Sequence, residues 1–339
     1  MATTPRQRRP LPAMRRAVRP RPRNLQSSPA SDAAEANVTI IEHGSLRWLD
    51  IRSITPATIE YLREEFNFHP LALDDLTSRA QRPKVDVYSA SLFIVMQFPR
   101  HDKATRTTFA AEVDIFVGSN YIITIHDGSL KPLTRMFDGA LESQEVREAL
   151  MERTSGHLLY YIIDRLVDYC FPIIDRMSER IEHIEDIIFE RAGIAVVQEI
   201  SIVRRDLIAL RRIIKPQMSV IAQLEHRDLP FVRGDIDVYF GDISDHLAKI
   251  WDSLEDEKEV LEGLSSTFDS LASHRLNDVI KTLTIISVII LPLTLITGVF
   301  GMNVPLPFAH SELALLIITL FMLLTSIAML VVFRMRRWL

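Results

Sequence analysis

The sequence predicts an α+β fold in which an N-terminal α/β domain is followed by a long helical stalk and two C-terminal transmembrane helices. Three observations support this fold class. Residues 37–150 mix strand-forming and helix-forming segments, residues 151–300 have an almost purely helical periodicity, and two uncharged runs occupy residues 283–300 and 313–333. Strands followed by a run of helices are typical of an α+β architecture.

Residues 1–36 form a separate segment at the N-terminus. They contain eight arginines and six prolines, with no acidic residue before Asp32. Such a composition does not bury a core, so we expect a disordered tail. A cytoplasmic tail touching anionic lipid is favoured over an organelle transit peptide, because the prolines would break an amphipathic targeting helix.

Residues 37–150 are expected to form a compact α/β domain. Thr55-Pro56 predicts a capped helix start with proline just inside it. β-branched and aromatic residues predict strands at residues 38–42, 46–50, 85–88, 92–98, 112–117 and 121–126. We find no Gly-rich phosphate loop, Ser/His/Asp arrangement or nucleophile elbow. The prediction is therefore a protein that is not an enzyme and has neither a nucleotide nor a nucleic-acid partner.

Residues 151–234 are predicted to form an antiparallel helical pair. Apolar residues at steps of three and four predict one amphipathic helix over residues 156–190, with an acidic polar face. A second helix over residues 196–224 carries a basic face, so we expect the two to pair around Ala192-Gly193. The single cysteine, Cys170, excludes a disulfide framework within the chain and is expected to be a buried thiol in a helix.

Residues 235–303 are predicted to form a stalk helix that continues into the first membrane helix. An unbroken helix over residues 235–300 would be ~100 Å long. A heptad seam along it requires a partner helix, and its members are Ile243, Leu247, Ile250, Leu254, Leu261, Leu264, Phe268 and Leu271. Residues 235–269 also contain eleven carboxylates against two lysines. If several copies of this helix stood side by side, their negative charges would repel each other unless cations lay between them. The alternative is that the acidic face is solvated and screened by salt.

The two uncharged runs form a membrane hairpin. The second run has twenty-one residues, enough to cross a hydrocarbon core of ~30 Å. The loop at residues 304–312 lacks Lys and Arg, whereas the chain ends in a basic segment at residues 334–339. By the positive-inside rule the loop is external and both termini are cytoplasmic.

A stripe of polar and small residues follows one face of the first membrane helix. Polar residues in a span tend to face a bundle interior, so this stripe is the candidate pore lining: Asn277, Ile280, Thr284, Ser287, Leu291, Thr294 and Gly298. The alternative is that the Thr and Ser hydroxyls only bond their own helix backbone. The stripe leads outward to the triplet Gly301-Met302-Asn303 at the end of the helix.

This triplet, the hairpin and the basic Trp-Leu ending together resemble the CorA family of divalent-cation channels, over residues 38–339. The resemblance implies a homopentamer in the inner (cell) membrane that transports Mg²⁺, with Co²⁺ or Ni²⁺ as further ions. It also makes Gly301, Met302 and Asn303 the selectivity filter. Mg²⁺ keeps several of its waters, so a ring of Asn303 carbonyls suits a hydrated ion.

The resemblance further implies that cytoplasmic Mg²⁺ is sensed at carboxylates between neighbouring subunits. Asp242, in Tyr239-Phe240-Gly241-Asp242-Ile243, matches the family's acid at the top of the stalk. Asp86, in Arg82-Pro83-Lys84-Val85-Asp86, matches the segment that supplies the opposing acid. Bound cations would hold the subunits together and closed.

No energy-coupling machinery is visible in the sequence. The spans lack Asp, Glu and Lys that could relay protons, and a divalent cation moving inward gains ~4.6 kcal/mol per 100 mV. We therefore expect uptake driven by the membrane potential.

Two other functions remain open from the sequence. The triplet is followed by Val304 rather than an aromatic residue and the acidic segment usual after it, which is similar to the zinc-transporting branch of the superfamily. The other alternative is a membrane-anchored scaffold whose hairpin only tethers the stalk.

Overall fold

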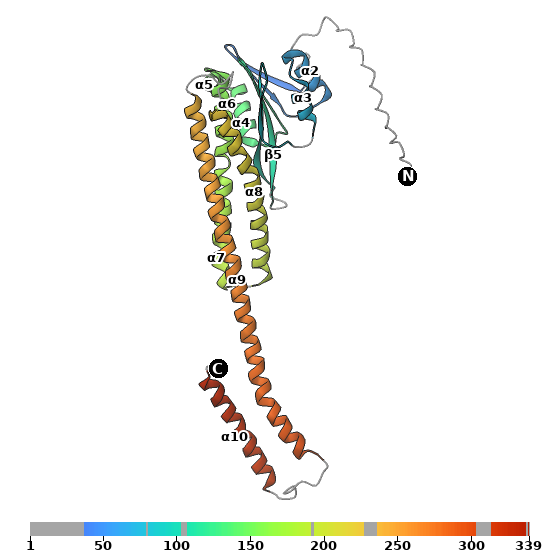
Figure 1. The fold of residues 1–339 in the computed structure, drawn as a ribbon, viewed down its shortest axis with the longest axis vertical. Coiled ribbons are helices and arrows are strands. Elements are labelled where there is room, and N and C mark those ends of the chain that lie inside the picture. Colours follow the sequence, from blue (N-terminus) through green and yellow to red (C-terminus); the bar gives the residue numbers. More distant parts are fainter. Residues whose placement is uncertain are drawn as a thin grey trace, which may run out of the picture.

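The computed structural model describes residues 37–78, 81–102, 107–190, 193–226, 236–302, 313–336 and 338. The predicted tail and external loop therefore lie outside the described residues, as does Asn303. Figure 1 shows a mixed α/β domain from which one long helix, α9, runs to a helical hairpin formed with α10.

A six-stranded mixed sheet forms the N-terminal domain, with strand order β1-β2-β6-β5-β4-β3. Neighbouring strands are antiparallel except β2 and β6, which are parallel. All six predicted strands are confirmed, and β4 and β5 are longer than predicted. Their bounds are β1 Val38–His43, β2 Leu46–Ile51, β3 Lys84–Val87, β4 Leu92–Asp102, β5 Thr107–Val117 and β6 Tyr121–His126.

Helices cover both faces of this sheet, because alternate strand residues point to opposite faces and both sets are apolar. Leu49, Phe93 and Phe116 face the core beneath α2 (Pro56–Phe66) and α3 (Pro70–Thr77). Trp48 and Ile94 face the larger core on the other side. The predicted helix start is confirmed, since Thr55 caps α2 through a capping box with Thr58 and Pro56 is its first residue.

The larger core runs without interruption from the sheet into the helices of the stalk. The helices that contribute to it are α4 Lys131–Glu142, α5 Gln144–Met151, α6 Ser155–Asp168, α7 Phe171–Glu190, α8 Ile194–His226 and α9 Ile236–Phe300. The unbroken helix predicted over residues 235–300 is confirmed as α9, which has 65 residues. In Figure 1, α7, α8 and α9 lie side by side; α8 packs against β4 and β5, and the three helices extend below the sheet.

The single helix predicted over residues 156–190 is wrong. The chain forms α6 and α7 instead, with a turn at Tyr169-Cys170 between them. Pro172 explains the break, because proline has no N–H to donate and its ring clashes with the carbonyl four residues earlier, which is that of Asp168. Cys170 is buried as predicted, but it lies in this turn.

The helices α7 and α8 do pair, but the predicted contact between an acidic and a basic face does not hold them together. Arg180 on α7 forms ion pairs of 3.0 Å with Glu199 and Asp206 on α8. The basic face of α8 meets α9 instead, where Arg211 lies 2.6 Å from Glu255. The acids of α9 therefore neutralise part of α8 within the same chain.

The heptad seam of α9 also finds its partners within the chain. Ile243, Leu247 and Leu254 are fully buried against α6, α7 and α8. The seam is thus satisfied without a second copy, and it carries no argument for an oligomer.

One buried acid in the sheet gives a prediction for pH dependence. Asp114 on β5 alternates with Val113 and Ile115 of the larger core, so it points to the face covered by α3. Its side chain is buried and its Oδ1 has no hydrogen-bond partner among the described residues. Burial, reinforced by the negative charges of Glu112 and Asp75, raises the pKa of Asp114 to about 8.

We expect the folded state to lose stability as pH rises from about 4 to about 8. The ordinary Asp pKa is about 3.9, so in this window the folded state keeps a proton that the unfolded state has released. Bound protons in the folded state make stability fall with rising pH, by at most about 1.4 kcal/mol per unit. Asp114→Asn should raise the unfolding temperature at pH 8 by several degrees and flatten the pH profile.

Thermal unfolding of the full-length protein in detergent, followed by tryptophan fluorescence to which buried Trp48 contributes, tests this. Asp74→Asn on the exposed side of α3 is the matched control. A pH profile that is the same in both variants would contradict the assignment.

Candidate functional site

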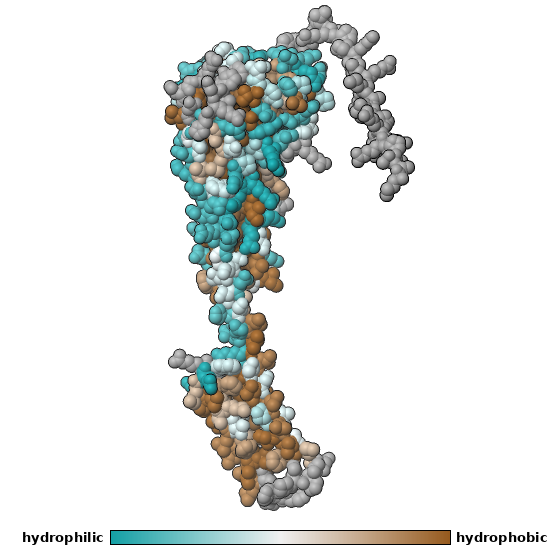
Figure 2. Space-filling view, in the orientation of Figure 1, coloured by the Kyte–Doolittle hydropathy of each residue, from teal (hydrophilic) through white to brown (hydrophobic). Residues whose placement is uncertain are grey.

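The lower part of the molecule has the composition of a membrane hairpin. Both α9 and α10 (Ala314–Met335) contain a stretch long and apolar enough to cross a membrane. Figure 2 shows hydrophobic residues covering this hairpin, in contrast to the hydrophilic surface of most of the domain and stalk above it. Because these side chains are exposed within one chain, lipid or further copies must cover them.

The predicted stripe lies on the part of α9 that faces away from α10. Ile285 is buried and Ile289 and Ile296 are partly buried, which marks the side that packs on α10. Asn277, Ile280, Ser287, Leu291, Thr294 and Gly298 are all exposed, and Thr284 is intermediate. The hairpin partner therefore does not occupy the face that carries the stripe.

The two threonine hydroxyls of the stripe bond their own helix, as the alternative interpretation expected. Thr284 Oγ1 donates to the carbonyl of Ile280 at 2.7 Å, and Thr294 Oγ1 donates to that of Ile290 at 3.0 Å. Each hydroxyl oxygen keeps lone pairs that can accept a hydrogen bond from a water molecule. A threonine hydroxyl can therefore donate its hydrogen to the backbone and still line a hydrated path.

The outer end of the stripe is a shallow groove of about 480 Å³ lined by Leu291, Thr294, Leu295, Gly298, Val299 and Met302. The Gly301 N–H donates to the carbonyl of Thr297 at 2.8 Å, and a Cβ at position 301 would lie 2.9 Å from that oxygen. A side chain at this position would force the end of the helix to shift. Met302 is 58% exposed, so one chain leaves most of its side chain unpacked.

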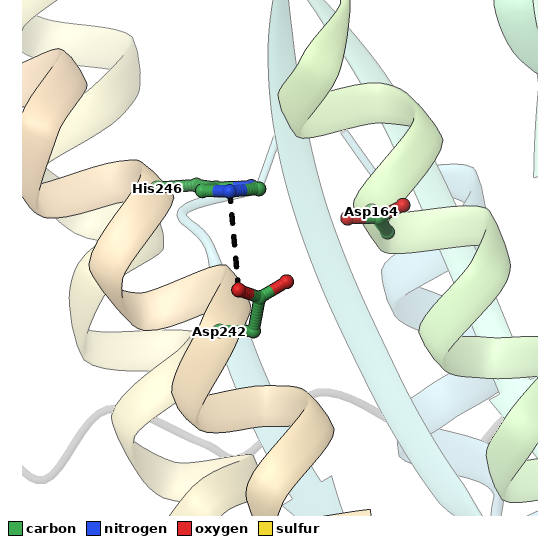
Figure 3. Close-up of side chains that lie close together, drawn as sticks. All are labelled: Asp164, Asp242 and His246. Atoms are coloured by element: carbon green, nitrogen blue, oxygen red, sulfur yellow. Dashed lines mark ion pairs between the residues drawn. The ribbon is translucent and has the colours of Figure 1, made fainter.

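A second cluster lies high on the stalk, where α6 meets α9. Figure 3 shows Asp164 of α6 directed toward Asp242 and His246 of α9. One ligand atom from each of these three residues lies within 4.8 Å of the other two. His246 Nε2 is 3.9 Å from Asp242, and its Nδ1 is 3.9 Å from Asp168.

Acidic side chains outnumber basic ones in this cluster. No lysine or arginine in the described ranges forms an ion pair with Asp164, Asp168 or Asp242. Partial burial, together with the negative charge of Asp168, raises the pKa of Asp164, although His246 opposes this. Burial and the charges of Asp164 and Asp242 also raise the pKa of Tyr160 to about 12. The site is one of negative potential.

The donor set fits a divalent metal ion. Two carboxylates and an imidazole can supply three ligands, and the buried His246 Nδ1 has no hydrogen-bond partner in the described part of the chain. Carboxylates suit Mg²⁺, whereas an imidazole suits Zn²⁺, Co²⁺ or Ni²⁺. Sequence analysis identified Asp242 but missed Asp164 and His246. The spacing of four residues between Asp242 and His246 could have signalled the histidine.

Asp86 lies apart from this cluster, on edge strand β3. Its carboxylate is 2.6 Å from Lys84 Nζ, so it is already paired within the chain. The structure thus places one predicted regulatory acid in a group of residues that could hold a metal ion, and the other in an ion pair. One chain does not bring Asp86 and Asp242 into one site.

Fold and site together define a membrane protein with a domain outside the bilayer and, at its stalk, a cluster of donors that could hold a metal ion. The model of the CorA-like Mg2+ transporter protein family matches residues 43–337. The chain therefore belongs to this family of membrane transporters. Membership confirms the resemblance seen in the sequence.

Relatives of known description span most of the chain. The putative metal ion transporter YfjQ of Bacillus subtilis is 32% identical, covering 76% of this chain and 78% of its own. The cobalt/magnesium transport protein CorA of Thermotoga maritima is 29% identical, covering 86% and 83%. The zinc transport protein ZntB of Pectobacterium atrosepticum is 24% identical, covering 76% of each.

The structure of the CorA magnesium transporter from Methanocaldococcus jannaschii has the same fold, with a TM-score of 0.77. It is 22% identical and covers 88% of this chain and 93% of its own.

Proposed function

We propose that this protein is a homopentameric channel that conducts hydrated divalent cations down the membrane potential, with Mg²⁺ as the principal ion. Both termini lie on the cytoplasmic side of the inner (cell) membrane. The observation that carries the proposal is the polar stripe of α9, which faces away from α10. One hairpin does not enclose a water-filled path, so several copies must converge on this stripe.

In this arrangement Asn303 forms an amide ring at the outer mouth, and Gly301 and Met302 shape it. The ring accepts hydrogen bonds from the water of a hydrated ion, and Mg²⁺ need not lose its shell. Toward the cytoplasm the stripe passes Thr294, Ser287 and Thr284 before it reaches Ile280 and Asn277. The spans contribute no carboxylate that would hold the ion tightly.

Closure follows from cations bound to the acids of the soluble region. We assign the regulatory Mg²⁺ to Asp242 and to Asp86 of a neighbouring copy. With the cation bound, the subunits are held together; without it, like charges push them apart. Asp164 and His246 belong to the same region of negative potential and supply the additional donors around Asp242.

Zinc transport is the second candidate. Val304 follows the triplet, ZntB proteins are among the relatives, and the stalk cluster includes an imidazole. Co²⁺ and Ni²⁺ share the hydrated size and charge that the proposed ring accepts.

Ion uptake into liposomes under a potassium diffusion potential tests the proposal. We expect Mg²⁺ and Co²⁺ to enter when the interior is negative and to stop at zero potential. Uptake of Zn²⁺ without Mg²⁺ would establish the second candidate. Absence of flux for every ion would favour the alternative of a membrane-anchored scaffold. Native mass spectrometry measures the number of subunits independently.

A further inference from the structure

A lysine holds the predicted regulatory acid of the sheet. Lys84 Nζ lies 2.6 Å from Oδ2 of Asp86 on β3 and 2.6 Å from Oδ2 of Asp75 on α3. All three side chains are about two-thirds buried or more. The ammonium also lies 5.6 Å from the centre of the Phe93 ring. One cation is thus clamped between two carboxylates.

The charge of Lys84 also acts on a third acid. Asp75 and Glu112 act electrostatically on buried Asp114, and Lys84 acts on it with the opposite sign. Burial lowers the pKa of Lys84, but hydrogen bonds to Asp75 and Asp86 outweigh this and raise it. Among the charges that act on Asp114, that of Lys84 is the one that lowers its pKa.

We propose that Lys84 is a built-in counter-cation that competes with a divalent cation for Asp86, and that Asp75 determines how strongly it competes. The inference rests on the proposed regulatory role of Asp86. A divalent ion that binds Asp86 must displace the ammonium or lie beside it, and two cations within a few ångströms repel each other. Lys84 would thereby set the concentration at which cytoplasmic Mg²⁺ closes the channel.

Substitutions of Lys84 and of Asp75, which form an ion pair, should shift the Mg²⁺ concentration needed for closure in opposite directions. Lys84→Met keeps the apolar stem beside Phe93 and removes the charge. It should move Mg²⁺-dependent closure to about fivefold lower concentration, as expected for a partly exposed ion pair. Asp75→Asn leaves the ammonium to Asp86 alone, and it should move closure to about threefold higher concentration. Lys84→Arg keeps the charge and should remain close to wild type.

Two readouts on the full-length protein test this. One is inhibition of liposome uptake by Mg²⁺ on the cytoplasmic side, and the other is protection by Mg²⁺ against limited proteolysis in detergent. A bridge that only stabilises the contact between α3 and β3 would lower the unfolding temperature in both variants without opposite shifts. The inference would be overturned if the wild type responds to Mg²⁺ but the Mg²⁺ midpoints of the two variants shift in the same direction or do not shift. Wild-type protein without any Mg²⁺ response would refute the proposed regulation itself.

Discussion

Asn303→Ala is expected to abolish divalent-cation uptake, which is the largest effect that we predict. The alanine methyl cannot accept a hydrogen bond, so the mouth would no longer hold a hydrated ion. The loss should be at least about a hundredfold, because the substitution removes every amide of the proposed pentameric ring at once and each lost hydrogen bond to an ion's water costs about 1 kcal/mol. Expression and oligomeric state should not change.

Uptake of Mg²⁺ and Co²⁺ into liposomes measures this effect. Thr319→Val on α10 is the matched control, because its hydroxyl bonds the Leu315 carbonyl of its own helix, as the stripe threonines do, yet lies off α9. Uptake within twofold of wild type in the Asn303 variant would exclude an amide ring as the selectivity filter.

Asp242→Asn should weaken closure by internal Mg²⁺ by about tenfold. The substitution removes one of the two carboxylates that form the three-residue cluster with His246, and it leaves a neutral amide of the same shape. A charge-assisted contact to an ion is worth about 1.5–3 kcal/mol, and partial exposure reduces that figure. The channel should therefore stay open at internal Mg²⁺ concentrations that close the wild type.

Inhibition curves recorded with Mg²⁺ on the cytoplasmic side measure the shift. Asp245→Asn is the control, since this exposed acid lies on the same helix but outside the cluster. Equal curves for the wild type and the Asp242 variant would remove this residue from the sensor. Equal shifts in the two variants would indicate a general charge effect of the stalk.

The hairpin and the long helix could be predicted from the sequence because each depends on a local property. An uncharged run of about twenty residues has few stable environments other than a bilayer. Periodicity at steps of three and four likewise marks α9 without knowledge of its neighbours. The stripe follows from the same periodicity, and its exposure away from α10 agrees with it.

The partners of these helices could not be predicted in the same way. The seam at Ile243 and Leu247 would fit a second copy of α9 equally well, yet it packs on helices of its own chain. The acidic face of α7 and the basic face of α8 suggested a direct match. Instead, Arg180 and Arg211 distribute the ion pairs over three helices. A charge pattern shows that a helix face can form ion pairs, but the packing of the helices decides which helix supplies the partners.

Sequence alone predicted an α/β domain joined by one long helix to a membrane hairpin whose first helix ends at Gly301-Met302-Asn303. These features follow from hydropathy, periodicity and adjacent residues, all of which are local. Only the tertiary structure decided that Asp164 and His246 join Asp242, and that Lys84 holds Asp86. Such groupings depend on how distant helices and strands cross, and a position in the chain carries no information about distance in space.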